Sequence, residues 1–310
     1  MKKLLTLILI LYCTLIVHAE PAKPAASVLN KTSWIHGSET CDGNTDGALD
    51  IYQHDSASFI VRQNKCLTFE APFMFVLAGE NKVLVLDTGA LEDSEGFSFY
   101  KEAKDILSEH HSSKEIIVLH SHGHGDHYAG DDGFDGKAGV TLVGTSRAAL
   151  NDFVELENWS TESIDIDLGE RLLTVLLTPG HQEEAITVYD HKTKWLLTGD
   201  SLYSGVVYVK DWEQYKRSIS RFSAFAKANE VSAILGTHIE MKNQPGSYYP
   251  IGSTYQPNES SLDLPVEDLF ALNEALTNRE PETLVFDRFI VEPMGTISKS
   301  ISNLFRWIKK

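Results

Sequence analysis

The segment SHGHGDHYAG, residues 121–130, constrains this chain more than any other part of its sequence. It places three histidines and an aspartate within six positions, directly after the apolar run KEIIVLH. Histidine is the commonest metal ligand in proteins, and carboxylates add the charge needed to hold a second dication. We interpret the segment as a metal-binding turn at the end of a buried strand. A histidine-rich surface tract is the alternative, and the preceding apolar run disfavours it.

The spacing inside the segment indicates how its side chains are arranged. His122 and His124 are two positions apart, so they point the same way if the backbone is extended there. Asp126 and His127 come after the turn that Gly125 permits, and they can be directed at a second point a few ångströms away. The segment alone therefore offers ligands for two neighbouring positions.

Four further acidic or histidine residues share one context, because each closes an apolar run. Taken singly, such a residue is more often a capping or hydrogen-bonded side chain than a ligand. Side chains at strand ends converge at one rim of a sheet, however, where loops commonly carry function. Together with the histidine-rich segment they predict two metal sites. The four residues are Asp87 after VLVL, His181 after LLTVLLTPG, Asp200 after WLLTG and His238 after VSAILGT.

The order of expected elements indicates the fold class. Runs such as SFIVRQ and FMFVLAG predict strands, and residues 97–110 have helical spacing. Strands and helices recur further along, ending with a helix over residues 212–230 and the strand VSAILGTH. This order favours two β-sheets packed face to face with helices outside. Periodicity alone leaves one doubly wound sheet as the alternative.

The complete set of motifs resembles the metallo-β-lactamase-fold hydrolase superfamily. Its hallmark is H-x-H-x-D-H followed by a distant histidine, a bridging aspartate and a last histidine. The matching positions span residues 87–238, within a compatible strand pattern over residues 49–241. The resemblance implies an α+β fold, a four-layer αβ/βα sandwich with two mixed β-sheets face to face.

The resemblance also implies a role for each residue. It implies one metal site from His122, His124 and His181, and a second from Asp126, His127 and His238. Asp200 would bridge the two sites, and Asp87 would orient a metal-binding histidine from behind. The cofactors implied are two divalent ions, zinc being the first choice.

A pair of close dications lowers the pKa of a bridging water, so hydroxide is available near neutral pH to attack a carbonyl or phosphoryl group. Hydrolysis is the reaction expected. No cysteine follows Cys66, which excludes the β-lactamase subclass with a cysteine ligand, and Asp200 resembles the bridging aspartate of hydroxyacylglutathione hydrolases and lactonases. We therefore expect cleavage of an ester, lactone or related acyl bond. A metallo-β-lactamase or phosphodiesterase of this fold, or a non-catalytic periplasmic metal-binding protein, are the alternatives.

Candidate substrate contacts follow from position. Asp126 and Tyr203 are the candidate catalytic residues. Tyr203 is included because lactonases of the superfamily carry a tyrosine three positions after the bridging aspartate, and a packed aromatic is the alternative for it.

Glu183 and Glu184 would disfavour anionic substrates if they face the metals, and would be ordinary solvated acids if they face outward. A long turn-rich stretch after His238 predicts a substrate wall, with a self-packed surface loop as the alternative. The wall residues expected there are Tyr248, Tyr249 and Tyr255.

The remaining expectations concern the ends of the chain and its surroundings. Residues 1–19 have the pattern of a secretory signal peptide, which predicts a periplasmic or secreted protein, and residues 20–48 read as a leader. Residues 49–310 would form a single hydrolase domain with a C-terminal helical extension. We expect that extension to dock on the protein's own body, with membrane-surface contact as the alternative.

Two properties of the mature part narrow its chemistry. Cys41 and Cys66 are its only cysteines, and export favours a disulfide between them over two unrelated thiols. The formal net charge of the whole chain, −17, which becomes −19 when Lys2 and Lys3 are removed with residues 1–19, disfavours a nucleic-acid partner, since phosphate backbones require a basic surface. A small-molecule substrate is therefore expected.

Overall fold

The computed structural model describes residue 29 and residues 33–107, 114–154 and 163–295. The expected signal peptide, residues 20–28 and 30–32 of the leader, and the expected C-terminal helix of residues 296–310 lie outside the described residues. Among the residues described, no helix is long and apolar enough to cross a membrane. The disulfide between Cys41 and Cys66 is present, with 5.1 Å between the Cα atoms.

The first sheet follows chain order from β1 to β6. Its first four strands pair antiparallel, and β4, β5 and β6 pair parallel. Helix α1 provides the crossover between β4 and β5. The elements are β1 (Leu49–Asp55), β2 (Ser58–Gln63), β3 (Phe73–Ala78), β4 (Lys82–Leu86), α1 (Phe99–Leu107), β5 (Glu115–Leu119) and β6 (Val140–Leu142).

The second sheet has the order β13-β12-β10-β9-β8-β7. Strands β9 and β10 form an antiparallel hairpin, and β10 also pairs in parallel with β12. The short helix α2 (Gly125–Tyr128) lies between β5 and β6 of the first sheet, and α3 (Arg147–Val154) lies in the connection from β6 to the second sheet. The strands are β7 (Ser163–Asp167), β8 (Leu172–Leu177), β9 (Ile186–Asp190), β10 (Trp195–Gly199), β12 (Ala233–Gly236) and β13 (Asp263–Leu264).

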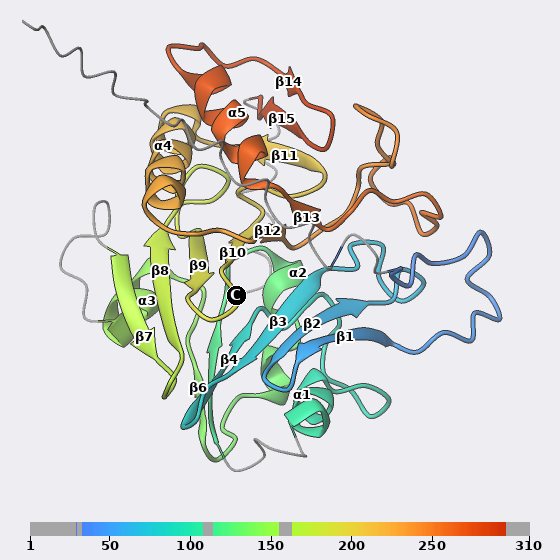
Figure 1. Cartoon of the computed structure of the whole chain (residues 1–310). Helices are drawn as coiled ribbons and strands as arrows, with labels where there is room; N and C mark the ends of the chain where they lie inside the picture. The colour runs from blue at the N-terminus through green and yellow to red at the C-terminus, as the bar shows by residue number, and fades with distance from the viewer. Residues whose placement is uncertain (1–28, 30–32, 108–113, 155–162, 296–310) are drawn as a thin grey trace, which may run out of the picture.

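A smaller third sheet, in the order β11-β15-β14, lies beside helices α4 and α5 (Figure 1). Strand β11 pairs in parallel with β15, which is far away in the sequence. The short helical turn η2 (Asp131–Gly133) follows α2 in the first half of the chain. The elements of this region are β11 (Val206–Val209), α4 (Trp212–Ala228), α5 (Val266–Leu276), β14 (Leu284–Val285) and β15 (Ile290–Pro293).

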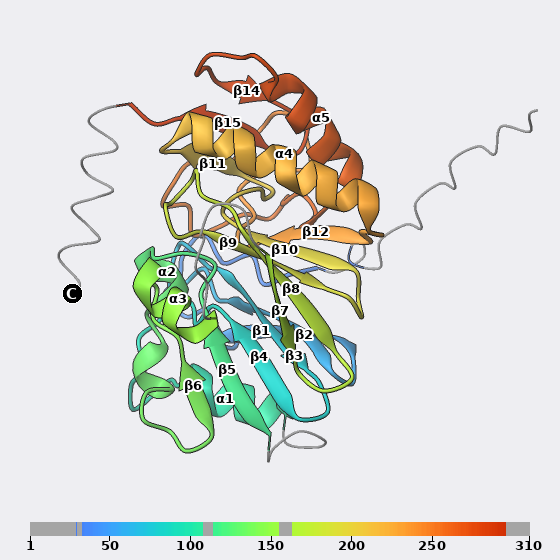
Figure 2. The same ribbon diagram turned by 90° about the vertical axis from the view of Figure 1, so that its left-hand side faces the viewer.

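Apolar side chains hold the layers together. Phe75 and Leu86 of the first sheet share one buried cluster with Val188 and Leu197 of the second, so the two sheets pack face to face. Helix α1 buries Phe99 and its neighbours against the outer face of the first sheet. Helices α4 and α5 cover the outer face of the second sheet (Figure 2). The expected four-layer sandwich of α+β class is confirmed.

A buried ion pair also connects the sheets. Arg171 is 3% exposed, and its guanidinium binds both carboxylate oxygens of Asp190 at 2.6 and 3.0 Å. The same guanidinium donates to the carbonyl oxygens of Ala57 and Ala78 and to the hydroxyl of Ser58 in the first sheet. The backbone carbonyls in the β1–β2 turn and at the end of β3 are thereby satisfied across the interface.

Candidate metal centre

The seven predicted ligands meet at one rim of the sandwich, although they come from four separate connections, those that follow β5, β8, β10 and β12. His122 and His124 follow β5, and Asp126 and His127 lie on α2. The other three each follow a buried strand of the second sheet, where the strand ends force their side chains toward the same rim. These are His181 after β8, Asp200 after β10 and His238 after β12.

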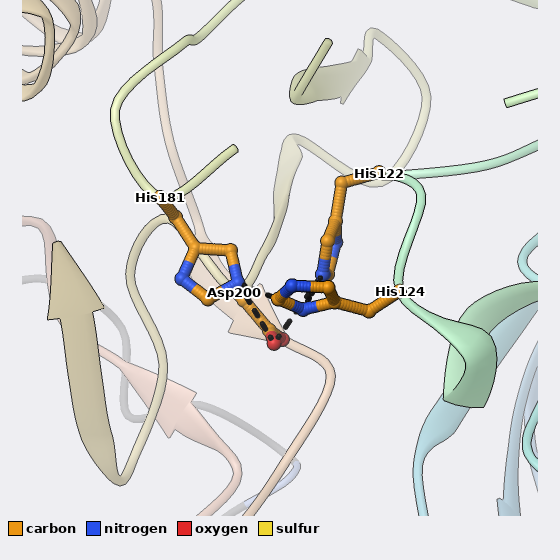
Figure 3. A group of neighbouring side chains, drawn as sticks. All are labelled: His122, His124, His181 and Asp200. Atoms are coloured by element: carbon orange, nitrogen blue, oxygen red, sulfur yellow. Dashed lines mark hydrogen bonds and ion pairs between the residues drawn. The ribbon is translucent and has the colours of Figure 1, made fainter. Parts of the chain in front are cut away.

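The first group consists of His122, His124, His181 and Asp200, whose ligand atoms converge on a common centre (Figure 3). His124 Nδ1 lies 2.9 Å from His122 Nε2 and 3.3 Å from His181 Nε2. Asp200 Oδ2 lies 3.7 Å from His122 Nε2 and 3.6 Å from His181 Nε2. Four tetrahedral ligands at about 2.0–2.2 Å from zinc stand about 3.3 Å apart, so these spacings fit a bound ion.

The second group lies directly beside the first. Asp126 Oδ2 is 3.4 Å from His127 Nε2 and 3.3 Å from His238 Nε2. Asp200 faces this group as well, with Oδ2 at 3.6 Å from His127 Nε2 and Oδ1 at 3.6 Å from His238 Nε2. One carboxylate therefore reaches both groups, which is the arrangement that a bridging ligand needs.

Hydrogen bonds on the far side of the rings set the direction of their lone pairs. The Nδ1 atom of His181 donates to the carbonyl of Tyr208 at 2.7 Å, and that of His238 donates to the carbonyl of Glu70 at 3.1 Å. Each Nε2 is then left as an acceptor aimed at the centre. His127 Nε2 is buried without a hydrogen-bond partner among the described residues, which a cation would supply. The donor set fits a divalent metal.

The sequence model of the metallo-beta-lactamase superfamily matches residues 67–268, a stretch that contains all seven of these residues. The chain belongs to the metallo-beta-lactamase superfamily. As a superfamily member it is a hydrolase, and its two histidine–aspartate groups are suited to divalent metal ions.

Individual similar proteins are distant. The human acyl-coenzyme A thioesterase MBLAC2 is 25% identical over 209 residues, which cover 55% of this chain and 72% of that protein. Among solved structures, the metallo-beta-lactamase from Pontibacter korlensis is 16% identical, with a TM-score of 0.47 over 74% of this chain and 100% of that one. TMB-1 is also 16% identical, with a TM-score of 0.49 over 75% and 99% of the two chains.

In this superfamily member, Asp87 supports the centre from behind. It ends β4 with a φ of +66°, in the left-handed region that is strained for a residue with a Cβ. Its carboxylate accepts the Nδ1–H of His127 at 2.9 Å and the backbone N–H of Ser121 at 2.6 Å. The Ser121 hydroxyl donates to it at 2.9 Å and lies 3.2 Å from His122 Nδ1. Asp87 therefore orients a histidine without joining either group.

Burial sets the protonation states of the ligands in the first group. Burial and the neighbouring His181 lower the pKa of His124 to about 3, and burial also lowers the pKa values of His122 and His181. Burial opposes ionisation of Asp200, but His238 and His127 nevertheless hold its pKa well below the usual range. Neutral imidazoles beside an ionised carboxylate are the forms that bind a metal.

Sequence reasoning missed several supporting contacts. The carboxamide of Gln182 contacts His124 Nε2 at 2.6 Å, which keeps Nδ1 of that ring facing the centre. The hydroxyl of Thr237 donates to Asp200 Oδ1. Both residues stand next to a predicted ligand in the sequence, but adjacency does not reveal which way such a side chain turns. Glu184 is buried with its carboxylate against Gly123, whereas Glu183 faces outward, 3.8 Å from Lys210.

A cavity of about 570 Å³ opens beside the metal groups. Its floor contains members of both groups, and apolar residues and buried charged residues form its sides. The lining residues used below are Lys65, Phe69, Glu70, Asp126, Tyr203, Tyr208, Glu240, Pro250, Ile251 and Met294. Such a volume is in the range of small-molecule sites.

Tyr203 lines this cavity, but its hydroxyl is already engaged. It donates to the carbonyl of Val206 at 2.6 Å and lies 3.2 Å from Glu240 Oε2. Tyr203 also packs tightly against Gly236, since a Cβ added to that glycine would lie 2.1 Å from the Cβ of Tyr203. These contacts are those of a packed aromatic side chain, which was the alternative interpretation of Tyr203.

The long loop does form a wall of the cavity, but the structure corrects which residues do so. Residues 250–253 line the cavity, and the three expected tyrosines do not. Tyr249 accepts a hydrogen bond from the Asn258 backbone, Tyr255 packs beside the ring of His36, and Tyr248 is 48% exposed. Their aromatic rings close the loop on itself and on the N-terminal segment, which leaves the intervening turn at the cavity.

Proposed function

We propose that this protein is an exported dinuclear metal-dependent hydrolase that cleaves an ester, lactone or related acyl bond. The observation that carries the proposal is the position of Asp200, whose two carboxylate oxygens face both ligand groups at 3.6–3.7 Å. A shared carboxylate between two ligand sets is what a two-metal site requires.

Zinc is the proposed metal. The first group supplies three imidazole nitrogens and a carboxylate, and the second supplies two imidazoles and a carboxylate in addition to the shared one. Borderline nitrogen and oxygen ligands in tetrahedral spacing suit zinc, whereas calcium and magnesium prefer oxygen. When bound, the ions would polarise the substrate's acyl oxygen and lower the pKa of a water molecule.

The chain's own groups would orient the substrate and the attacking water. Hydrolysis adds the oxygen of water to the acyl carbon and breaks the bond to the leaving oxygen or sulfur, which takes up a proton. Asp126 lines the cavity with its side chain 20% exposed, so its carboxylate is placed to accept a hydrogen bond from the attacking water and to orient it. The buried rim around it keeps bulk water from competing for these hydrogen bonds.

Acyl substrates are favoured over phosphodiesters by the charge of the cavity. The scissile group would lie beside Asp126 and Asp200, which line the cavity floor. A phosphodiester would place its negative charge directly beside these two carboxylates. The name of the human relative, an acyl-coenzyme A thioesterase, supports an acyl bond for this chain too.

A metal and substrate survey tests the proposal. We expect two zinc ions per chain after mild purification, and chelator-sensitive hydrolysis of an aryl ester, a lactone or an acyl thioester. Asp200→Asn should lose at least one ion and most activity, whereas His191→Ala, a histidine at the end of β9, should keep both. One ion or none with no turnover contradicts the proposal. Two ions without turnover indicate a metal-binding protein, and faster cleavage of a β-lactam or bis-aryl phosphate indicates the alternative enzymes.

Export is supported by the disulfide between Cys41 and Cys66, because such bonds persist mainly in oxidising compartments. Cell fractionation and the intact mass of the native protein test this part. We expect a periplasmic or secreted protein that lacks residues 1–19 and carries no free thiol. Full-length protein in the cytoplasm with reduced cysteines would contradict export without touching the hydrolase proposal.

A further inference from the structure

Lys65 is the only lysine or arginine among the residues that line the cavity. The residue is 3% exposed, and its ammonium donates to the carbonyl of Phe69 at 2.8 Å. In the described part of the chain, no carboxylate oxygen lies within 4.0 Å of Nζ to form an ion pair with it. An ammonium group has three N–H donors, so two of them remain for another partner.

The acids nearest to Lys65 are already committed to other groups. Both oxygens of Glu259 bind the guanidinium of Arg62 at 2.5 and 2.7 Å. Glu240 accepts the backbone N–H of Val206 at 2.8 Å. The carboxyl groups of Glu259, Glu240 and Glu70 act on Lys65 only from a distance, and each raises the pKa of its ammonium. Burying a charge without a counter-ion is costly. Burial and the neighbouring Arg62 accordingly lower the pKa of Lys65 to about 8, which still leaves it mostly protonated at neutral pH.

The position of this lysine is fixed by its surroundings. The next residue, Cys66, is bonded to Cys41, and its backbone N–H donates to the Asn64 side chain at 2.8 Å. The N-terminal segment passes so close that a Cβ on Gly37 would lie 2.9 Å from the Cβ of Lys65. A preorganised cation of this kind loses little conformational entropy when a ligand binds.

The mouth of the same cavity is apolar. Phe69 is 41% exposed and Ile251 is 69% exposed, although both line the cavity. Exposed large apolar side chains beside a cavity favour an apolar ligand, since their burial is favourable. The walls therefore offer an apolar surface for the body of a substrate and one cation for an anionic end.

We propose that Lys65 binds a carboxylate at the end of the substrate remote from the scissile acyl bond, so that the substrates are apolar acyl compounds with an ω-carboxylate. This inference rests on the proposed hydrolase function for the reacting bond only. It identifies Lys65 as a specificity-determining residue, because the reaction itself does not require it.

Two esters of equal chain length test the proposal. Monophenyl adipate and phenyl hexanoate differ only in the terminal group, which is a carboxylate in one and a methyl in the other. For the metal-loaded wild type we expect kcat/KM to be about 10- to 100-fold higher for the adipate ester, the effect of one charge-assisted hydrogen bond. Lys65→Met should abolish that preference through KM, and leave the hexanoate ester within about twofold of the wild type. Lys65→Arg should keep part of the preference.

Lys114→Met is the matched control, since Lys114 also donates to a backbone carbonyl, that of Gly79, but does not line the cavity. This variant should have the same kcat/KM as the wild type for both esters. Equal loss on both esters in Lys65→Met, or no preference in the wild type, would overturn the proposal and leave Lys65 as a support for the Phe69 backbone.

A binding measurement separates this inference from the proposed function. Calorimetry with adipate and hexanoate needs no turnover, and both acids can place one carboxylate at the metals. We expect the wild type to bind adipate at least tenfold more tightly than hexanoate, and Lys65→Met to bind the two acids equally. If neither ester is cleaved but this difference is found, the hydrolase proposal fails and the anion site stands. If adipate and hexanoate bind the wild type alike, the anion site fails.

Discussion

The carboxylate of Asp87 and the imidazole of His127 are joined by a 2.9 Å hydrogen bond, and both side chains are completely buried. Asp87 thereby holds Nδ1 of His127 on the side away from the metal groups and directs Nε2 toward the centre that the carboxylates of Asp126 and Asp200 also face. The two residues lie 40 positions apart in the sequence and meet because β4 and β5 are adjacent parallel strands.

Replacing Asp87 should weaken the second metal position selectively. Loss of an outer carboxylate typically lowers metal affinity about 10- to 100-fold. We expect Asp87→Asn to retain one ion per chain and to lose the second during dialysis, as measured by elemental analysis and chelator competition. Asp131→Asn is the control, because Asp131 also pairs with a histidine, His120, at 2.9 Å, but outside both groups. Equal metal loss in both variants would show that the effect is merely structural.

Metal removal should destabilise the protein as well as inactivate it. The two groups bring buried histidines and aspartates together, and ligands that bind only the folded state stabilise it by mass action. At 100 times the dissociation constant the effect is about 2.7 kcal/mol. We expect a chelator to lower the melting temperature by several degrees and zinc to restore it, in calorimetric scans. An unchanged melting temperature after verified metal loss would contradict this coupling.

The sequence predicted the centre because each ligand ends a locally recognisable apolar strand. The runs over β2–β5, β8–β10 and β12 are buried along nearly their whole length, so hydrophobicity alone marks them. Strands such as β11, β13 and β14 contain two to four residues and exist through pairing with distant partners. No local pattern specifies such pairing, which is why these strands and helix α5 were not predicted.

The cavity walls were less predictable than its floor. The tyrosines of the long loop were predicted as substrate-wall residues. Tertiary contacts instead hold these rings away from the cavity, and the turn at residues 250–253 lines it. Lys65 carried no signal, because lysine is almost always exposed, and its burial follows from the disulfide and from the close approach of Gly37. Side-chain direction in loops is decided by contacts that sequence spacing does not encode.

The Arg171–Asp190 pair should be essential for stability and irrelevant to chemistry. Truncation of one partner leaves an unpaired buried charge, which typically costs about 3–5 kcal/mol. We expect Arg171→Met to lower the free energy of unfolding by that amount in urea titrations, with metal stoichiometry unchanged in the folded protein. Lys192→Met is the control, since Lys192 pairs with Asp55 at the surface and such pairs contribute about 0–1 kcal/mol. Similar losses in the two variants would refute a special role for the buried pair.

The preference for a carboxylate substrate should decline with rising pH. Lys65 has its pKa lowered to about 8, so it is protonated below that value and becomes neutral above it. The charged groups around it are Arg62, Glu259, Glu240 and Glu70. Loss of the ammonium charge weakens the attraction for an anion.

The kcat/KM ratio of monophenyl adipate to phenyl hexanoate isolates this effect, because titrations at the metal centre act on both esters and cancel. The ratio reports the free enzyme. We expect it to fall from its neutral-pH value toward one as the pH rises through about 8, the pKa of Lys65. Lys65→Arg, whose guanidinium stays charged, should keep its ratio above pH 8. A wild-type ratio that stays constant to pH 9 would show that Lys65 does not hold the substrate's charge.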